Sequence, residues 1–156
     1  MPAMRTITGF RQDDEGDWIA DLDCAHSQHM RHNPLMVSRP WVLDPAGRQA
    51  KIGTTVSCPL CDRTELPAGL VLLRTAGPFD QDAIPAGLRR RHRTANGTWG
   101  VLRVLSGTTG FRMDAVPPRD LVLSAGQSQP IPPGVEHQVE PAGPVRLVLE
   151  FWGASS

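Results

Sequence analysis

The chain has 156 residues, enough for one or two small domains with a modest core. Sixteen basic and sixteen acidic side chains cancel, so no overall field attracts nucleic acid or an anionic membrane. Its 15 glycines and 15 prolines, in a chain that is 40% hydrophobic, indicate many turns between short strands, and hence an all-β protein. No apolar run reaches the roughly 18 residues of a membrane span, and no signal-peptide core follows Met1. We therefore expect a soluble, cytoplasmic protein.

The first part of the chain alternates short strand patterns with turns. Residues 17–22 (DWIADL) follow a polar turn at 12–16 and alternate apolar and polar side chains, which predicts a strand. Residues 51–57 predict another strand, and the stretch between them, including the turn at 44–47 (DPAG), predicts loops and short strands.

Each of these two predicted strands leads into a pair of metal-ligand residues. Cys24 and His26 follow the first strand, and Cys58 and Cys61 follow the second. Three thiolates and one imidazole are a tetrahedral set expected for structural zinc. A redox C-x-x-C pair or unliganded core cysteines are the alternatives, but no βαβ setting surrounds the pair. His29 is the alternative to His26 as the imidazole ligand.

Three motifs in this region carry a family resemblance. They are GF-x-QD-x-x-GDW at residues 9–18, C-x-H-x-QH-x-RHNP at 24–34 and C-x-x-CDR at 58–63. Residues 1–63 thus resemble a small bacterial family of unknown function. The resemblance implies a zinc-ribbon-like β module and carries no known activity.

The polar segment 64–68 (TELPA) is the expected boundary, giving domains at 1–63 and 64–156. Beyond it, turn residues separate about eight short strand candidates, which predict a jelly-roll barrel. The candidates are residues 70–75, 88–94, 99–105, 110–114, 120–123, 129–131, 136–140 and 145–152.

The stretch 126–137 (GQSQPIPPGVEH) joins two turn glycines, a strand-edge proline and a histidine. Its spacing Gly126, Pro132, Gly134, His137 resembles the second motif of the cupin family, without that motif's closing asparagine. The first motif would normally offer two histidines and a glutamate. Here it keeps His92 alone, with Thr94 and Gly100 near the other ligand positions.

Residues 66–152 as a whole resemble TehB/YeaR-like cupins, on His92 with Trp99, the turn before His137 and the closing VRLVLEFW at 145–152. That resemblance implies a cupin, RmlC-like jelly roll associated with tellurite resistance or nitrate response.

The last strand candidate places Glu150 among apolar residues, where a buried carboxylate needs a cation or donors. We therefore consider a second divalent metal (Zn, Fe, Mn or Ni) in the barrel, held by His92, His137 and Glu150 with open positions. In the alternative, Glu150 is a surface residue and the histidines are hydrogen-bonded core groups.

The run Arg89–Arg93 is basic but has no interleaved aromatic residue, so a nucleic-acid site is not expected. Arg90 would share a strand face with His92 and could hold a small anion there. The ligand-binding candidates are Arg90, Thr94 and Trp99. The alternative for Arg90 is a surface salt bridge.

Two functions fit these patterns. In the first, the protein is a stress-associated metal-binding module whose barrel holds a small molecule or oxyanion, without nucleic-acid or membrane partners. In the second, the barrel is a small metal-dependent enzyme, an oxygenase or isomerase acting on a small polar substrate. The sequence decides neither enzyme status nor the homodimer that cupin-like strand exchange would form.

Overall fold

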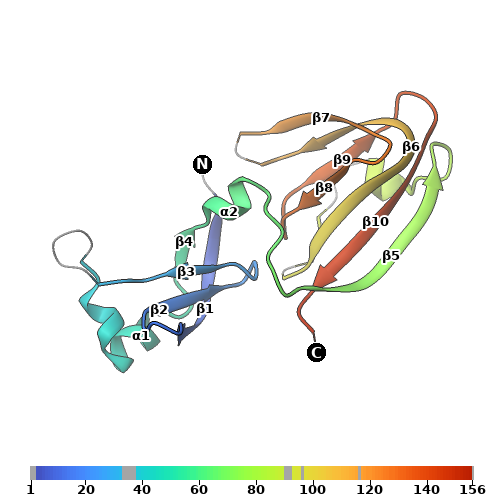
Figure 1. Cartoon of the computed structure of the whole chain (residues 1–156). Coiled ribbons are helices and arrows are strands. Elements are labelled where there is room, and N and C mark those ends of the chain that lie inside the picture. The colour runs from blue at the N-terminus through green and yellow to red at the C-terminus, as the bar shows by residue number, and fades with distance from the viewer. Residues whose placement is uncertain (1–2, 33–37, 90–92, 96, 116, 156) are drawn as a thin grey trace. The chain divides into compact units, whose positions relative to one another are not determined.

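The computed structural model describes residues 3–32, 38–89, 93–95, 97–115 and 117–155. The chain forms two compact units, Pro2–Cys58 and Pro59–Ser156, each built mainly of β-strands (Figure 1). This division falls a few residues before the boundary predicted at 63/64. No helix of the described residues is long and apolar enough to cross a membrane.

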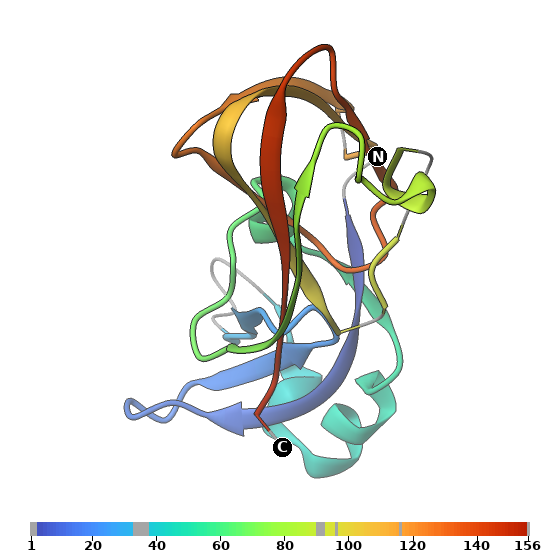
Figure 2. The same cartoon turned by 90° about the vertical axis from the view of Figure 1, so that its right-hand side faces the viewer.

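The N-terminal unit contains a four-stranded sheet in the order β3-β2-β1-β4, antiparallel throughout. Its strands are β1 (Met4–Gln12), β2 (Trp18–Leu22), β3 (Ser27–His29) and β4 (Thr55–Ser57). β1, the darkest blue strand of Figure 2, has a register shift between Ile7 and Gly9 and pairs with β2 at one end and β4 at the other. The sheet curls, so that the side chain of Gln28 in β3 donates a hydrogen bond to the carbonyl of Ser57 in β4.

Two short helices replace loops that the sequence predicted between β3 and β4. They are a 3-10 helix, η1 (Pro40–Leu43), and α1 (Pro45–Lys51). Asp44 takes the extended N-cap conformation, and Pro45 stands in the first turn, where its missing N–H is harmless. The turn predicted at 44–47 is therefore wrong, and the strand predicted at 51–57 begins only at Thr55.

The C-terminal unit contains a six-stranded antiparallel sheet, preceded by the helix α2 (Pro59–Asp62). Four strands follow the order β5-β10-β6-β7, and β8 and β9 also pair with β6. Their bounds are β5 (Val71–Asp80), β6 (Trp99–Met113), β7 (Arg119–Ser124), β8 (Ser128–Ile131), β9 (His137–Glu140) and β10 (Val145–Gly153).

The predicted strands 99–105 and 110–114 are one long strand, β6. Gly107 takes φ +75° within it, and a Cβ at that position would lie 2.1 Å from the carbonyl oxygen of Pro144. A glycine inside a strand can thus mark a bend as well as a break. The first half of β6 pairs with β10 and β8, and the second half pairs with β7 and β9.

The described residues of the strand predicted at 88–94 do not form a strand. Residues Ala86–Arg89 form a 3-10 helix, η2, and residues 93–95 are not in a strand. Pro85 stands just before the helix, and its carbonyl accepts a hydrogen bond from Leu88, which turns inward. Residues 90–92 lie outside the described residues.

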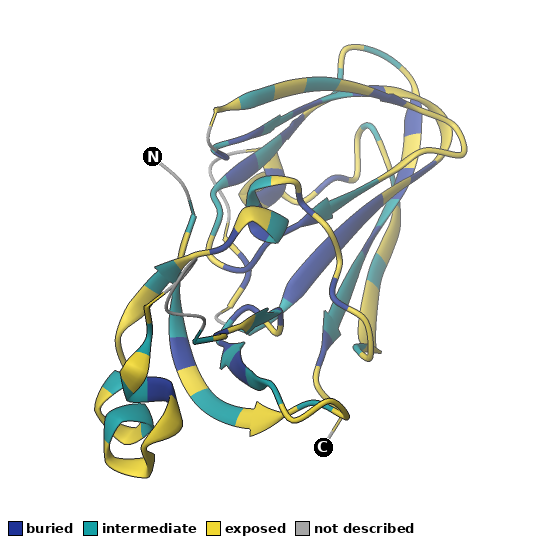
Figure 3. Cartoon of the chain, turned by 60° about the vertical axis from the view of Figure 1, so that its left-hand side comes forward, coloured by how far each residue is buried: buried dark blue, intermediate teal, exposed yellow. Residues whose placement is uncertain are grey.

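One apolar cluster fills the C-terminal unit, drawn from β6, β7, β8, β9, β10 and η2. Figure 3 shows buried residues in dark blue along these strands, while α1 is yellow and teal because it buries no residue. The cluster contains Ile84, Leu88, Leu102, Val104, Phe111, Met113, Ala115, Leu123, Ile131, Val139, Val145, Leu147 and Leu149.

Candidate metal centre

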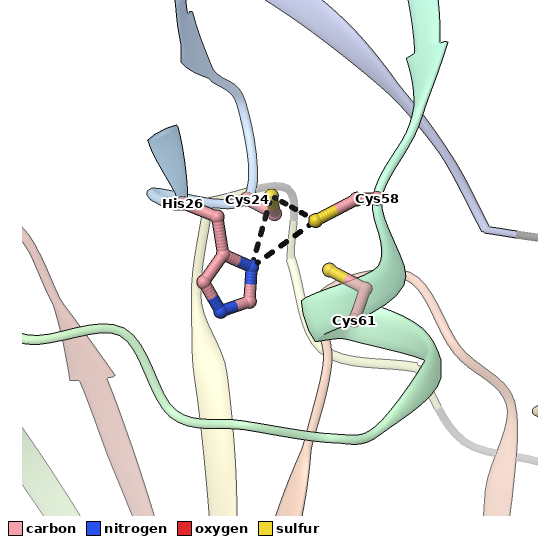
Figure 4. Close-up of side chains that lie close together, drawn as sticks. All are labelled: Cys24, His26, Cys58 and Cys61. Atoms are coloured by element: carbon pink, nitrogen blue, oxygen red, sulfur yellow. Dashed lines mark hydrogen bonds between the residues drawn. The ribbon is translucent and has the colours of Figure 1, made fainter. Parts of the chain in front are cut away.

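Two tight turns bring four sulfur- and nitrogen-bearing side chains together. Cys24 and His26 lie on the turn between β2 and β3, where the Ala25 N–H donates to Leu22 and the Leu22 N–H donates to the His26 carbonyl. Cys58 directly follows β4, and Cys61 lies in α2. Figure 4 shows the four side chains converging from these two places.

The distances between the four ligand atoms fit one tetrahedral metal ion. His26 Nδ1 lies 3.4 Å from each of Cys24 Sγ and Cys58 Sγ, and the two sulfurs lie 3.9 Å apart. All four ligand atoms are within 4.8 Å of one another. Tetrahedral zinc with its usual bond lengths would separate two sulfurs by about 3.8 Å and sulfur from nitrogen by about 3.6 Å. The cluster therefore has the size that one bound ion requires.

The same distances exclude a disulfide between Cys24 and Cys58. A disulfide bond measures about 2.05 Å, well below the 3.9 Å between Cys24 and Cys58, and all three cysteines are buried and outside any disulfide. A third thiol and an imidazole beside the C-x-x-C pair complete a four-ligand set, which favours metal binding over a redox role.

Of the two histidine candidates, His26 joins the cluster and His29 does not. His29 is exposed and pairs with Asp13, at 3.1 Å between Nε2 and Oδ2. The Asp17 backbone N–H is the largest influence and lowers the pKa of Asp13 below its ordinary value. Burial opposes it, and the Glu15 N–H and His29 each lower the pKa by less. His29 therefore belongs to a surface hydrogen-bond group at the β1–β2 turn.

The residue between the first two ligands has a left-handed backbone. Ala25 takes φ +73°, a region where a side chain costs roughly 1–2 kcal/mol. Its side chain is exposed, while Cys24 and His26 on either side are buried. This conformation turns the side chains on either side of Ala25 inward, so the backbone strain lies between the two ligands that it positions.

Of the three predicted barrel ligands, the structure describes His137 and Glu150. His137 opens β9, is buried, packs against Phe111 with 5.9 Å between ring centroids, and makes a hydrogen bond through Nδ1 with the Val135 carbonyl. Two predicted turn glycines precede it, and both take positive φ, +86° at Gly126 and +72° at Gly134. His92 and Arg90 lie outside the described residues.

Glu150 lies on the wrong side of the sheet for a ligand beside His137. Its carboxylate accepts hydrogen bonds from Arg103 Nε, at 2.8 Å, and from Trp152 Nε1, at 3.1 Å. Leu149 faces the apolar cluster, so Glu150 next to it faces away. The acid in an apolar strand is explained by an arginine on the neighbouring strand. Among the described residues, the Cys/His cluster is the single group of three or more metal ligands.

A cavity in the C-terminal unit contains one predicted ligand-binding residue and two that the sequence did not single out. Thr94 lines a cavity of about 410 Å³ together with Arg74 and Phe151. Trp99 is fully buried, but it faces away from Thr94, towards which its neighbour Gly100 points. Arg74 and Phe151 become neighbours through the pairing of β5 with β10, and the sequence alone did not reveal that pairing.

Two family matches divide the chain in the same order as the predicted modules. Residues 8–65 match the family described as a protein of unknown function (DUF3565), and residues 74–149 match the TehB-like domain. No curated protein matches the chain.

Solved structures share the fold of the C-terminal unit at low sequence identity. A crystal structure of a protein from E. coli (strain K12) is 22% identical, with a TM-score of 0.54, and the match covers 59% of this chain and 98% of that one. TehB from Haemophilus influenzae is also 22% identical, with a TM-score of 0.51. That match covers 56% of this chain and only 32% of TehB.

Proposed function

Because the chain joins a DUF3565 region to a TehB-like domain, we propose that it is a metal-binding, cupin-type, stress-associated protein of the tellurite- or nitrate-response type. In this proposal a structural zinc holds the N-terminal region, and a jelly roll formed by the C-terminal unit binds a small ligand or oxyanion. The observation that carries the proposal is the buried cluster of Cys24, His26, Cys58 and Cys61.

The composition of the cluster favours zinc in a structural role. Thiolate ligands select soft or borderline metals, and a Cys₃His set fills all four positions of tetrahedral zinc, leaving none for substrate. Residues 2–58 are also few for a self-sufficient core, and a metal commonly compensates for that in a domain of this size. Zinc binding to such sites, roughly 10–16 kcal/mol, exceeds the stability of most small domains.

Ligand binding in the C-terminal unit is supported by the TehB-like match and by the cavity beside Thr94. A metal-dependent oxygenase or isomerase is the second candidate, and it needs a second metal with open positions. Of the predicted ligands for that metal, the described residues include His137, and the carboxylate of Glu150 already accepts a hydrogen bond from Arg103. We therefore favour a binding module over an enzyme.

Metal content per chain tests the proposal, measured by elemental analysis on protein purified without a His tag. We expect one zinc per chain, lost in Cys58→Ser and retained in His137→Ala. His29→Ala is the matched control, because it removes a histidine near the cluster but outside it. Protein that holds no metal after purification and after reconstitution with zinc would refute the structural role. A second metal that disappears in His137→Ala would instead support the enzyme.

A further inference from the structure

We propose that the cavity around Arg74 binds an organic carboxylate with a compact apolar body, rather than a free inorganic oxyanion. Arg74 holds the carboxylate, Thr94 completes the polar end, and the wall around Phe151 takes the apolar body. This inference rests on the ligand-binding part of the proposed function and assigns the class of ligand.

Two cavities of the C-terminal unit meet at the same pair of side chains. One measures about 410 Å³ and the other about 250 Å³, and Arg74 and Phe151 line both. The guanidinium carbon of Arg74 lies 4.3 Å from the centroid of the Phe151 ring. The pair sits on the facing strands β5 and β10, at directly opposed positions. A ligand held at this pair can therefore extend into both spaces.

Arg74 is the cation available at this site. Its side chain stacks on Phe151, and no carboxylate of the described residues lies within ion-pair distance of it. Arg93, the other arginine of the larger cavity, is already paired with Glu136, with 2.5 Å between the charged atoms. A planar guanidinium whose ring contact leaves its N–H edge free is suited to a carboxylate, which it can bind through two parallel hydrogen bonds.

Thr94 supplies a second polar group at the same cavity. Its exposure is 5%, and its hydroxyl oxygen is buried without a hydrogen-bond partner. Buried hydroxyls in folded proteins are almost always paired, so the unpaired hydroxyl of a residue that lines a cavity points to a partner from outside the chain. A hydroxyl can donate to a carboxylate oxygen beside the arginine.

The smaller cavity is lined mainly by apolar side chains, which favours an organic ligand over an inorganic one. Apart from Arg74, its wall is formed by side chains without charge, including Phe79, Pro85, Leu88 and Leu149. A cavity of about 150 Å³ with such a lining accommodates benzene, so about 250 Å³ accommodates a phenyl or short branched alkyl group. Phosphate, nitrate or tellurite would leave this surface uncovered.

The test is a titration of the full, zinc-containing chain with benzoate and with phenylacetate, in which binding is monitored through backbone amide NMR shifts. Benzamide serves as the neutral analogue of benzoate, and phosphate and nitrate serve as inorganic anions. The variants are Arg74→Gln, Thr94→Val and Phe151→Leu. Arg146→Gln is the matched control, since Arg146 is an exposed arginine of β10 outside both cavities.

We expect saturable shifts with the two carboxylates, at least tenfold weaker binding of benzamide, and no saturation with either inorganic anion. Arg74→Gln should weaken benzoate about tenfold or more and Thr94→Val about threefold or more, while Arg146→Gln changes nothing. The inference is overturned if phosphate or nitrate binds as tightly as benzoate, if Arg74→Gln has no effect, or if no carboxylate binds. Zinc content is measured on the same samples. Carboxylate binding by protein that takes up no zinc even on reconstitution would refute the structural zinc alone. Zinc-loaded protein that binds no carboxylate would refute this inference alone.

Discussion

Replacing Ala25 with glycine should tighten zinc binding, because the turn between Cys24 and His26 is left-handed at this position. Ala25 takes φ +73° and its side chain is exposed, so the substitution removes backbone strain without removing core packing. The left-handed conformation costs roughly 1–2 kcal/mol with a side chain present. Part of that gain is offset because glycine is more flexible in the unfolded chain, which leaves about 1 kcal/mol.

The assay for Ala25→Gly is competition for zinc with a chelator of known affinity. Where metal binding and folding are coupled, a gain of about 1 kcal/mol in the folded state appears as an apparent affinity about fivefold tighter. Ala50→Gly is the matched control, because Ala50 is exposed in the helix α1, where glycine costs up to about 1 kcal/mol. The same substitution should therefore act in opposite directions at the two positions. Equal or weaker zinc binding by Ala25→Gly would refute the strain assigned to this turn.

Three further predictions concern other parts of the chain. Gly107→Ala should destabilise the C-terminal unit by more than about 2 kcal/mol in urea unfolding, because a Cβ there meets a carbonyl oxygen at 2.1 Å. Gly126→Ala is the control: Gly126 has φ +86° and open space around it, so this change should cost only about 1 kcal/mol. An NMR titration should show Asp13 with a pKa below its ordinary value of 3.8, chiefly because of the Asp17 N–H, and a midpoint at or above 3.8 would contradict this. The ionised Asp13 carboxylate stabilises the fold fully above pH 3.8, and this stabilisation is lost as the pH falls through the lowered pKa. Glu150→Gln should leave the metal content unchanged and alter stability by less than about 1 kcal/mol, because its arginine pair is partly exposed; loss of a metal would restore Glu150 as a ligand.

The metal cluster was predictable because its ligands lie close together along the chain. Cys24 and His26 share one turn, Cys58 and Cys61 share another, and in both the spacing itself limits the geometry. The choice of His26 over His29 needed the structure, since it depends on which side chain the turn directs inward. Strand alternation in residues 145–152 was also predictable, and Val145, Leu147 and Leu149 are buried as a set.

The remaining features depend on pairing between distant segments. Glu150 resembled a buried ligand until the structure placed Arg103 on the adjacent strand. Arg74 and Phe151 carry no motif and meet only through the register of β5 against β10. The helix at 45–51 was hidden because proline and glycine there indicated a turn, while the extended Asp44 and Pro45 begin a helix.

The position of β10 in the sheet determines when the C-terminal unit can complete its fold during synthesis. Among the described residues, β5 pairs with β10 and with no other strand, although β10 is made roughly 70 residues later. On the ribosome, β5 must therefore emerge and wait for several seconds, at about 5–20 residues per second, before β10 is made. Val71, Leu72 and Leu73 are exposed in the folded unit as well, so what waits for β10 is the backbone edge of β5, which is open to other nascent chains in that interval. Chaperone demand should therefore be greatest just before β10 is translated.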